Sequence, residues 1–118
     1  MFSRYYLIPE INSYVLELNG DASKDGGINI LSGAAHQILD QNPNSIIIDQ
    51  ADENFRISSR GLGEIIGLIS KFKNDSNISF SRIRGSLKKI LTRMELYKEY
   101  SYYETLNEAI DARRKKLS

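Results

Sequence analysis

Two adjacent serines, Ser58 and Ser59, are the residues of this sequence that are best placed to carry chemistry. The apolar residues that follow them recur at helical spacing, which predicts a helix that begins at the serines. Serine stabilises a helix N-terminus by accepting a hydrogen bond from a free backbone N–H group, and the same free groups favour a bound phosphate. The pair therefore offers a phosphorylation switch. The alternative is that Ser59 is an unmodified N-cap.

Two glycines lie on the polar side of this predicted helix. Gly63 and Gly67 accompany Arg60 and Glu64 away from the apolar stripe, which consists of Leu62, Ile65, Ile66, Ile69 and Phe72. Each glycine costs a helix interior about 1 kcal/mol relative to alanine, so another requirement should offset that cost. One interpretation is a flat face that lets the backbone of a partner approach. The other is relief of crowding against a neighbouring helix of the same domain.

Residues for catalysis or metal binding are scarce. His36 is the only histidine, there are no cysteines, and no nucleophile-elbow sequence surrounds any serine. Asp49, Asp52 and Glu53 follow an apolar run, where carboxylates can hold Mg²⁺, but a solvated acidic loop is the favoured interpretation. We therefore predict a binding module and not an enzyme, with no catalytic residue, no metal and no cofactor.

A glycine-rich segment at residues 20–27 precedes another predicted helix. Backbone N–H groups in such a segment can hold phosphate, but the spacing here fits neither a P-loop nor a dinucleotide fingerprint. A nucleotide or small-ligand sensor that uses this segment is the weaker hypothesis. The segment is interpreted as a plain connection or as part of a partner surface, which would include Asp21 and Asp25.

The composition is that of an ordinary globular domain. Of the 118 residues, 41% are hydrophobic and 26% are charged, and the formal net charge is +1. These values do not indicate disorder or a global basic field for nucleic acid. The sequence also has no apolar run that approaches the roughly 20 residues that a membrane span needs. The N-terminus lacks the layout of a signal peptide. We expect a cytoplasmic protein with one domain over residues 1–118, a core over about 5–112 and a basic tail at 113–118.

Hydrophobic patterning predicts strands that alternate with helices. Strand-like runs lie at 5–8, 14–19, 45–49, 78–81 and within 97–103. Four helical stripes are predicted. The first is Leu31, Ala34, Ala35, Ile38 and Leu39, the second is the stripe after the serines, and the third is Leu87, Ile90, Leu91 and Met94. The fourth follows a capping box of Thr105 and Glu108 and consists of Leu106, Ala109, Ile110 and Leu117. The order predicts an α/β fold with a mixed, mostly parallel sheet of four to five strands and about four helices. An N-terminal hairpin should supply an antiparallel edge.

Two segments carry a family resemblance. Ser45-Ile-Ile-Ile-Asp49, followed by a short loop and Ser58-Ser59-Arg60-Gly61-Leu62-Gly63 at the start of an apolar helix, resembles the STAS domain family. Bacterial anti-sigma factor antagonists typify this family. The closing stretch Tyr103-Glu-Thr-Leu-Asn-Glu-Ala-Ile110 is similar to the last segment of the family. The likeness covers about residues 5–112, and the order of elements agrees.

The resemblance implies partner switching. An unphosphorylated antagonist binds an anti-sigma factor kinase of the ATP-binding type, phosphorylation of a serine or threonine at the start of the central helix ends the binding, and a phosphatase resets the cycle. Other STAS domains serve in stress-signalling assemblies or in lipid-trafficking transporters without such a cycle, which is the alternative function. Neither reading involves direct nucleic-acid binding or membrane insertion, and the oligomeric state stays open.

The sequence departs from the family pattern at the acceptor position. Counting forward from Asp49 places Ser59 there, with Arg60 as an insertion, whereas counting back from Gly61 places Arg60 there, and arginine cannot accept phosphate. Ile57 also replaces an aspartate of the pattern. We expect phosphorylation at Ser59, with Ser58 as the second candidate. The expected partner-binding residues are Ser59, Arg60, Gly61, Gly63, Glu64, Gly67, Asp21 and Asp25.

Overall fold

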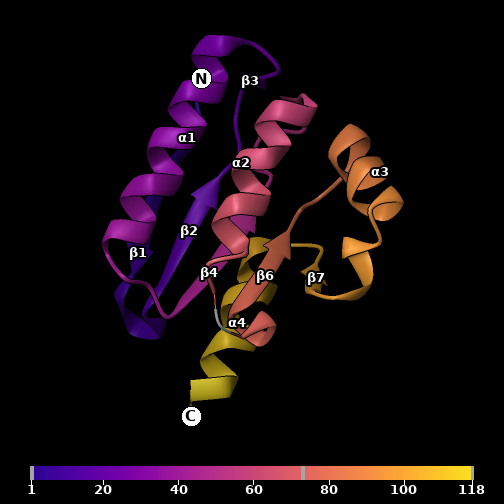
Figure 1. Cartoon of the computed structure of the whole chain (residues 1–118). Coiled ribbons are helices and arrows are strands. Elements are labelled where there is room, and N and C mark those ends of the chain that lie inside the picture. The colour runs from indigo at the N-terminus through magenta and orange to yellow at the C-terminus, as the bar shows by residue number, and fades with distance from the viewer. Residues whose placement is uncertain (1, 73, 118) are drawn as a thin grey trace.

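A five-stranded sheet runs through the centre of the computed structural model, which describes residues 2–72 and 74–117 (Figure 1). Its spatial order is β1-β2-β4-β6-β7. The strands span Arg4–Ile8, Ser13–Glu17, Ser45–Asp49, Ile78–Ser81 and Ser101–Tyr103, respectively. The β1–β2 pair is antiparallel and the other three pairs are parallel. The predicted mixed sheet with an antiparallel N-terminal edge is therefore confirmed.

Strand β4 lies at the middle of the sheet because its sequence suits burial on both faces. All five of its residues are buried, as a continuous apolar run between two parallel neighbours requires. Ile46 and Ile48 belong to the larger core, whereas Ile47 belongs to a smaller core on the opposite face. Strand β6 is also buried at all four positions, and its two apolar residues, Ile78 and Phe80, belong to the larger core.

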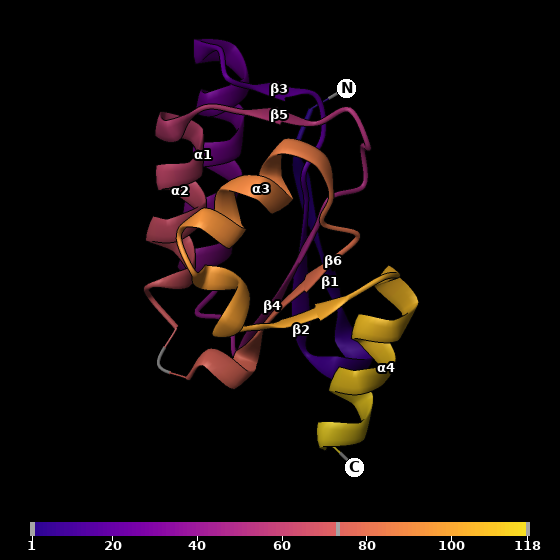
Figure 2. The same ribbon diagram turned by 90° about the vertical axis from the view of Figure 1, so that its right-hand side faces the viewer.

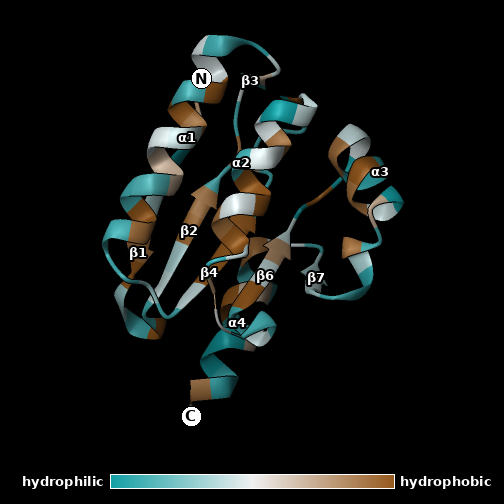
Figure 3. Ribbon diagram, viewed as in Figure 1, coloured by the Kyte–Doolittle hydropathy of each residue, from teal (hydrophilic) through white to brown (hydrophobic). Residues whose placement is uncertain are grey.

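The helices divide between the two faces of the sheet (Figure 2). Helices α1 (Asp25–Asp40), α2 (Ser59–Ile69) and α3 (Gly85–Arg93) contribute buried residues to the larger core, and α4 (Leu106–Leu117) covers part of the other face through Ala109. Figure 3 shows that most of α4 is hydrophilic. No helix among the described residues combines the length and apolar character that crossing a membrane requires. Short 3₁₀ helices span Pro9–Ile11, Asp75–Asn77 and Leu96–Lys98.

The largest difference from the sequence prediction lies at the segment 20–27. Helix α1 begins at Asp25, within the expected loop, and the short strand β3 (Asp21–Ala22) precedes it. Strand β3 pairs in parallel with another short strand, β5 (Arg56–Ile57). A side chain at Gly27 would collide with the backbone carbonyl of Asp21, so glycine is needed for this close approach and not for loop flexibility.

The helices near the C-terminus follow their sequence signals with two exceptions. The predicted capping box is present, because the N–H group of Glu108 donates to the Thr105 hydroxyl at 3.1 Å. Met94 and Leu117, which were expected on apolar stripes, are exposed, since α3 ends at Arg93 and α4 extends beyond the sheet. Leu87 and Leu91 of α3 are buried as expected.

Candidate functional site

Ser58 is the N-cap of α2. It has an extended backbone, with φ of −96° and ψ of 172°, and its side-chain oxygen accepts a hydrogen bond from the N–H group of Gly61 at 3.2 Å. Its hydroxyl also lies 3.4 Å from the carbonyl oxygen of Ala22 in β3, to which it donates. The interpretation of Ser59 as the N-cap is therefore wrong. Ser58 satisfies one of the free N–H groups and ties the start of α2 to β3.

Ser59 is the first residue of α2, and its side chain is exposed. Within residues 2–72 and 74–117 its hydroxyl has no hydrogen-bond partner. A group attached to this oxygen would stand in solvent beside the positive end of the helix dipole, where a negative charge is favoured. The two serines are thus different in kind: Ser58 maintains the helix end, and Ser59 is accessible for modification.

Ser59, Gly63 and Gly67 form one exposed line along α2. They are four residues apart, which places them on the same side of the helix, and all three are exposed. A side chain added at Gly63 or Gly67 would meet no atom within 4 Å. Crowding against α1 therefore does not explain these glycines, and the approach of a partner to this face stays a prediction.

Gly61 has a different role from the two exposed glycines. It is buried, and an added side chain would collide with the carbonyl oxygen of Ala22. Glycine at this position lets the first turn of α2 lie against β3. Gly61, expected as a partner-binding residue, thus lies inside the fold, beneath the surface that Ser59 and Gly63 expose.

The pairing of β3 with β5 brings the predicted acidic residues to the start of α2. Asp25 accepts a hydrogen bond at 2.8 Å from Arg60, whose position next to Ser59 interrupts the family pattern. The Asp21 carboxylate accepts hydrogen bonds from the hydroxyl and the N–H group of Ser23, which hold its pKa below the ordinary value. The surface around Ser59 therefore carries carboxylates on the side of α1, and cations accompany them: Arg60 pairs with Asp25, and Lys24 and Arg56 help to lower the pKa of Asp21.

The connection between β4 and β5 is fixed by Asp52. Its carboxylate accepts hydrogen bonds from the N–H groups of Gly20 and Asn54, both at 2.9 Å, and these bonds lower its pKa. They hold the segment that leads into β5, and through β5 they fix the position of the Ser58 cap. Asp52 thus has a structural role at the base of the candidate site.

Asp49 has no part in an acidic loop. Its side chain is fully buried at the end of β4 and is ion-paired with Arg82, whose own pKa this contact raises. The hydroxyl of Ser81 donates a further hydrogen bond to Asp49 at 2.8 Å. Asp49, Asp52 and Glu53 thus do not converge, and the described part of the chain contains no group of three or more residues suited to a metal ion.

His36 lies beside the glycine line, a position that sequence reasoning missed. It is exposed on α1, where its Nδ1 atom lies 2.7 Å from the carbonyl oxygen of Ser32. Together with Glu64 and Gly67 it lines a small cavity of about 150 Å³ between α1 and α2. The only available signal was topological: parallel neighbouring strands place their crossover helices side by side.

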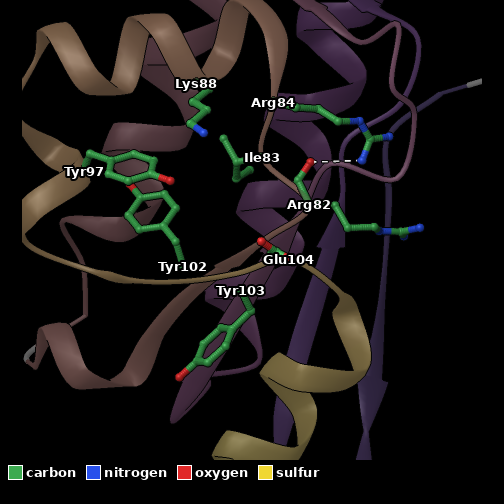
Figure 4. Close-up of a pocket in the computed structure, with 8 residues that line it drawn as sticks. All are labelled: Arg82, Ile83, Arg84, Lys88, Tyr97, Tyr102, Tyr103 and Glu104. Atoms are coloured by element: carbon green, nitrogen blue, oxygen red, sulfur yellow. Dashed lines mark hydrogen bonds between the residues drawn. The ribbon is translucent and has the colours of Figure 1, made fainter.

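A separate cavity of about 350 Å³ lies at the carboxyl ends of β6 and β7 (Figure 4). Its lining includes three cations, but two of them are engaged elsewhere: Arg82 pairs with Asp49, and Arg84 donates to the carbonyl oxygen of Arg82 at 3.2 Å. In the close-up the side chains of Arg82 and Arg84 both point away from Tyr97. The third cation, the ammonium group of Lys88, lies 5.8 Å from the centre of the Tyr97 ring. This cavity is not an assembled anion site.

Comparisons with solved structures identify the fold. The structure of an anti-sigma factor antagonist from Mycobacterium paratuberculosis matches with a TM-score of 0.77 at 19% sequence identity, over 95% of this chain and 92% of that chain. A candidate anti-sigma factor antagonist from Thermotoga maritima matches with a TM-score of 0.74 at 15% identity, over 95% and 94%, respectively. No protein-family model matches the sequence, and no curated protein matches it significantly. The predicted STAS-like α/β fold is confirmed.

Proposed function

We propose that this protein is a regulator of the anti-sigma factor antagonist type, which binds an anti-sigma factor and is released from it by phosphorylation of Ser59. One observation carries the proposal: an accessible serine at the start of α2 lies in line with two exposed glycines that the fold itself does not need. The likeness to two structures described as anti-sigma factor antagonists supports the same role.

The binding surface in this proposal comprises residues 58–67 with Asp21 and Asp25. The glycine line lets a partner backbone come close to α2, because no side chain projects from it. Arg60 and Glu64 flank that line and provide polar contacts. Asp21 and Asp25 add carboxylates, which lie beside cations of the same surface, so a partner would meet charged groups of both signs here.

Phosphorylation would act on this surface and not on the fold. A phosphate on Ser59 adds nearly two negative charges at a helix N-terminus, where the dipole tolerates them. The same charges stand where a partner would approach Gly63, and a partner that docks there would have to strip them of water. The partner is then repelled while α2 remains folded. The enzyme that adds the phosphate would be the anti-sigma factor itself, a kinase of the ATP-binding type, and a phosphatase would remove it.

The first test is to map phosphate on the protein isolated from its own cells. Peptide mass spectrometry, with and without phosphatase treatment, should find a phosphatase-sensitive phosphate on Ser59 and none on Ser58, because the Ser58 hydroxyl is engaged as the cap. Phosphate on Ser58 alone would require the cap to open and would contradict the proposed acceptor.

The second test is a titration against purified anti-sigma factors of the ATP-binding kinase type from the same genome. Ser59→Ala should bind one of them as the unmodified protein does, and Ser59→Asp should bind at least about tenfold more weakly, a difference of 1.4 kcal/mol. Ser86→Asp is a matched control, because Ser86 is also an exposed serine in the first turn of a helix. It should leave binding unchanged.

Absence of phosphate during both growth and stress, together with full binding by Ser59→Asp, would contradict the switch. Stable co-purification with a larger assembly or a membrane ATPase, unaffected by Ser59→Ala, would then favour a STAS subunit that has no phosphorylation cycle.

A further inference from the structure

The edge of the sheet at β1 is open. Strand β1 pairs with β2 on one side only, and no described strand lies on its other side (Figure 1). An uncovered edge strand presents unpaired N–H and C=O groups, and proteins commonly protect it with charges, proline or a bulge. The charge of Arg4, at the start of β1, is paired with Glu17 at 2.6 Å, and residues 5–8 carry no charge.

Three exposed apolar side chains belong to the segment around β1 and to the adjoining helix α1. Phe2 is 61% exposed, Leu7 is 42% exposed, and Ile30 on α1 is 37% exposed. A groove of about 350 Å³ runs between β1 and α1, with Arg4, Tyr5, Ile30 and Gly33 in its lining. Of these three side chains, Ile30 lines the groove, so the groove presents an exposed apolar side chain beside the open strand edge.

The part of α1 beside this edge is free of charge. Residues 26–39 contain no aspartate, glutamate, lysine or arginine, although 26% of the whole chain is charged. Gly33 lies in the middle of this run, and an added side chain there would meet no atom within 4 Å. Depletion of charge is the compositional sign of the centre of a protein interface. Gly33 repeats on α1 the feature that Gly63 and Gly67 show on α2: an exposed helix glycine that packing does not require.

We infer that this surface, the β1 edge together with the adjoining side of α1, joins two copies of this chain into a twofold symmetric dimer. In an isologous interface each patch meets itself, so a patch of one charge sign would repel its copy. Among the described residues, Arg4 is the one charged residue in the lining of this groove, and it is paired with Glu17 of its own chain, so the patch adds little net charge to repel its copy. The open edge of β1 pairs best with another open strand edge, and a second copy of this chain supplies one. The two β1 strands would run antiparallel, extend the sheet across the axis, and bring the two α1 helices together at Ile30 and Gly33.

This dimer leaves the surface around Ser59 open. Asp25 and His36 lie on the side of α1 that faces α2, whereas Ile30 and Gly33 lie on the side that faces β1. Each copy in the dimer would therefore present its own α2 line. The inference does not depend on phosphorylation or on the identity of the partner.

Sedimentation equilibrium over a range of about 1 to 500 µM tests the inference on the full chain. The unmodified protein should approach twice the mass of one chain as concentration rises. Gly33→Arg should weaken this association at least about 100-fold, because it places two cations at the axis. Arginine also favours a helix more than glycine does, so the variant should stay folded. Leu7→Lys, a second variant, should weaken association by placing a charge on the edge strand.

Gly63→Arg is the matched control, because it makes the same change at an exposed glycine of α2. It should leave the dimer intact while weakening partner binding, and Gly33→Arg should do the reverse. Amide hydrogen exchange should show residues 4–8 becoming more protected as concentration rises. A protein that stays monomeric over the whole range, or a dimer that survives both Gly33→Arg and Leu7→Lys, would overturn the inference. So would capture of a different protein at this edge by the monomer.

Discussion

Arg60 donates a hydrogen bond of 2.8 Å to Asp25 and so joins the first turn of α2 to the first turn of α1. The two side chains are 65% and 82% exposed, respectively. Ion pairs this exposed contribute little to stability, because water screens the attraction and two flexible side chains must be ordered. The contact is weak enough for a docking partner, or a phosphate on Ser59, to rearrange it.

A double-mutant cycle with Arg60→Ala and Asp25→Ala should therefore give a coupling free energy below about 1 kcal/mol in urea unfolding. The pair should matter more in a partner titration, since both side chains lie on the proposed surface. A coupling of several kcal/mol in the free protein would mean that the pair holds the fold together, and that the surface is less adaptable than we propose.

Ser58→Ala should lower the free energy of unfolding by about 1 kcal/mol, because it removes the acceptor for the N–H group of Gly61. Ser59→Ala is the matched control at the neighbouring position and should change stability by less than about 0.5 kcal/mol, since its hydroxyl has no partner among the described residues. Chemical denaturation distinguishes the two variants. Equal losses would show that both serines support the helix end.

Alanine substitution should stabilise the protein at the two exposed glycines of α2, Gly63 and Gly67, and destabilise it at the buried one, Gly61. Gly67→Ala should raise stability by about 0.5–1 kcal/mol, because the added methyl group meets no neighbour and alanine favours the helix. Gly61→Ala should lower it by about 1–3 kcal/mol, because the methyl group collides with the carbonyl oxygen of Ala22. Thermal unfolding of both variants and of Gly63→Ala, which should behave as Gly67→Ala does, checks this expectation.

Asp49→Asn should be among the most destabilising polar changes, with a loss of about 3 kcal/mol. The Asp49 side chain is fully buried, and its loss of charge would leave Arg82, which is only 34% exposed, without its counter-charge. Glu17→Gln provides the comparison: the Arg4 partner of Glu17 is 69% exposed, so the loss should be about 1 kcal/mol or less. Urea unfolding at neutral pH measures both. A small effect of Asp49→Asn would mean that water reaches this pair.

Asp52 should contribute an acid-dependent part of the stability. The hydrogen bonds from the N–H groups of Gly20 and Asn54 favour the charged carboxylate and depress its pKa below the ordinary 3.8. The native state therefore binds its proton less readily than the unfolded state does. The contribution is fully present above the unfolded-state pKa and is lost as pH falls through the lower, native pKa. Between neutral pH and pH 3, the melting temperature of Asp52→Asn should fall less than that of the unmodified protein. Parallel curves would contradict this role.

The sequence predicted the layers of the fold because its strong signals were local. The run Ser45–Asp49 indicated a central strand, Thr105 and Glu108 indicated a helix start, and the alternation of strands and helices indicated a mostly parallel sheet. The short strands β3 and β5 were missed because two residues have no periodicity, and neither Asp21 nor Arg56 favours a strand. Their pairing is decided by tertiary contacts, to which the Gly27 backbone and the Asp52 carboxylate contribute.

The candidate site was predicted only in part, because some of its features are local in sequence and others depend on tertiary contacts. A serine pair before an apolar helix is visible in sequence, but which serine caps the helix depends on the backbone angles at Ser58. The ion pair of Asp49 with Arg82 joins residues at the ends of two strands. Arg82 also has a positive φ of 56°, and no local sequence pattern predicts either the ion pair or this backbone conformation. The neighbours His36 and Gly67 come from two helices that only the strand order brings together.

The open glycines of α2 also bear on how this protein would respond to selection in the laboratory. If heat resistance alone were selected, Gly63 and Gly67 should be among the first positions to change, since alanine at either one strengthens the helix and disturbs nothing around it. If partner binding were selected at the same time, both glycines should persist. A sequencing record of the two experiments would thus separate what the chain needs to fold from what it needs to recognise.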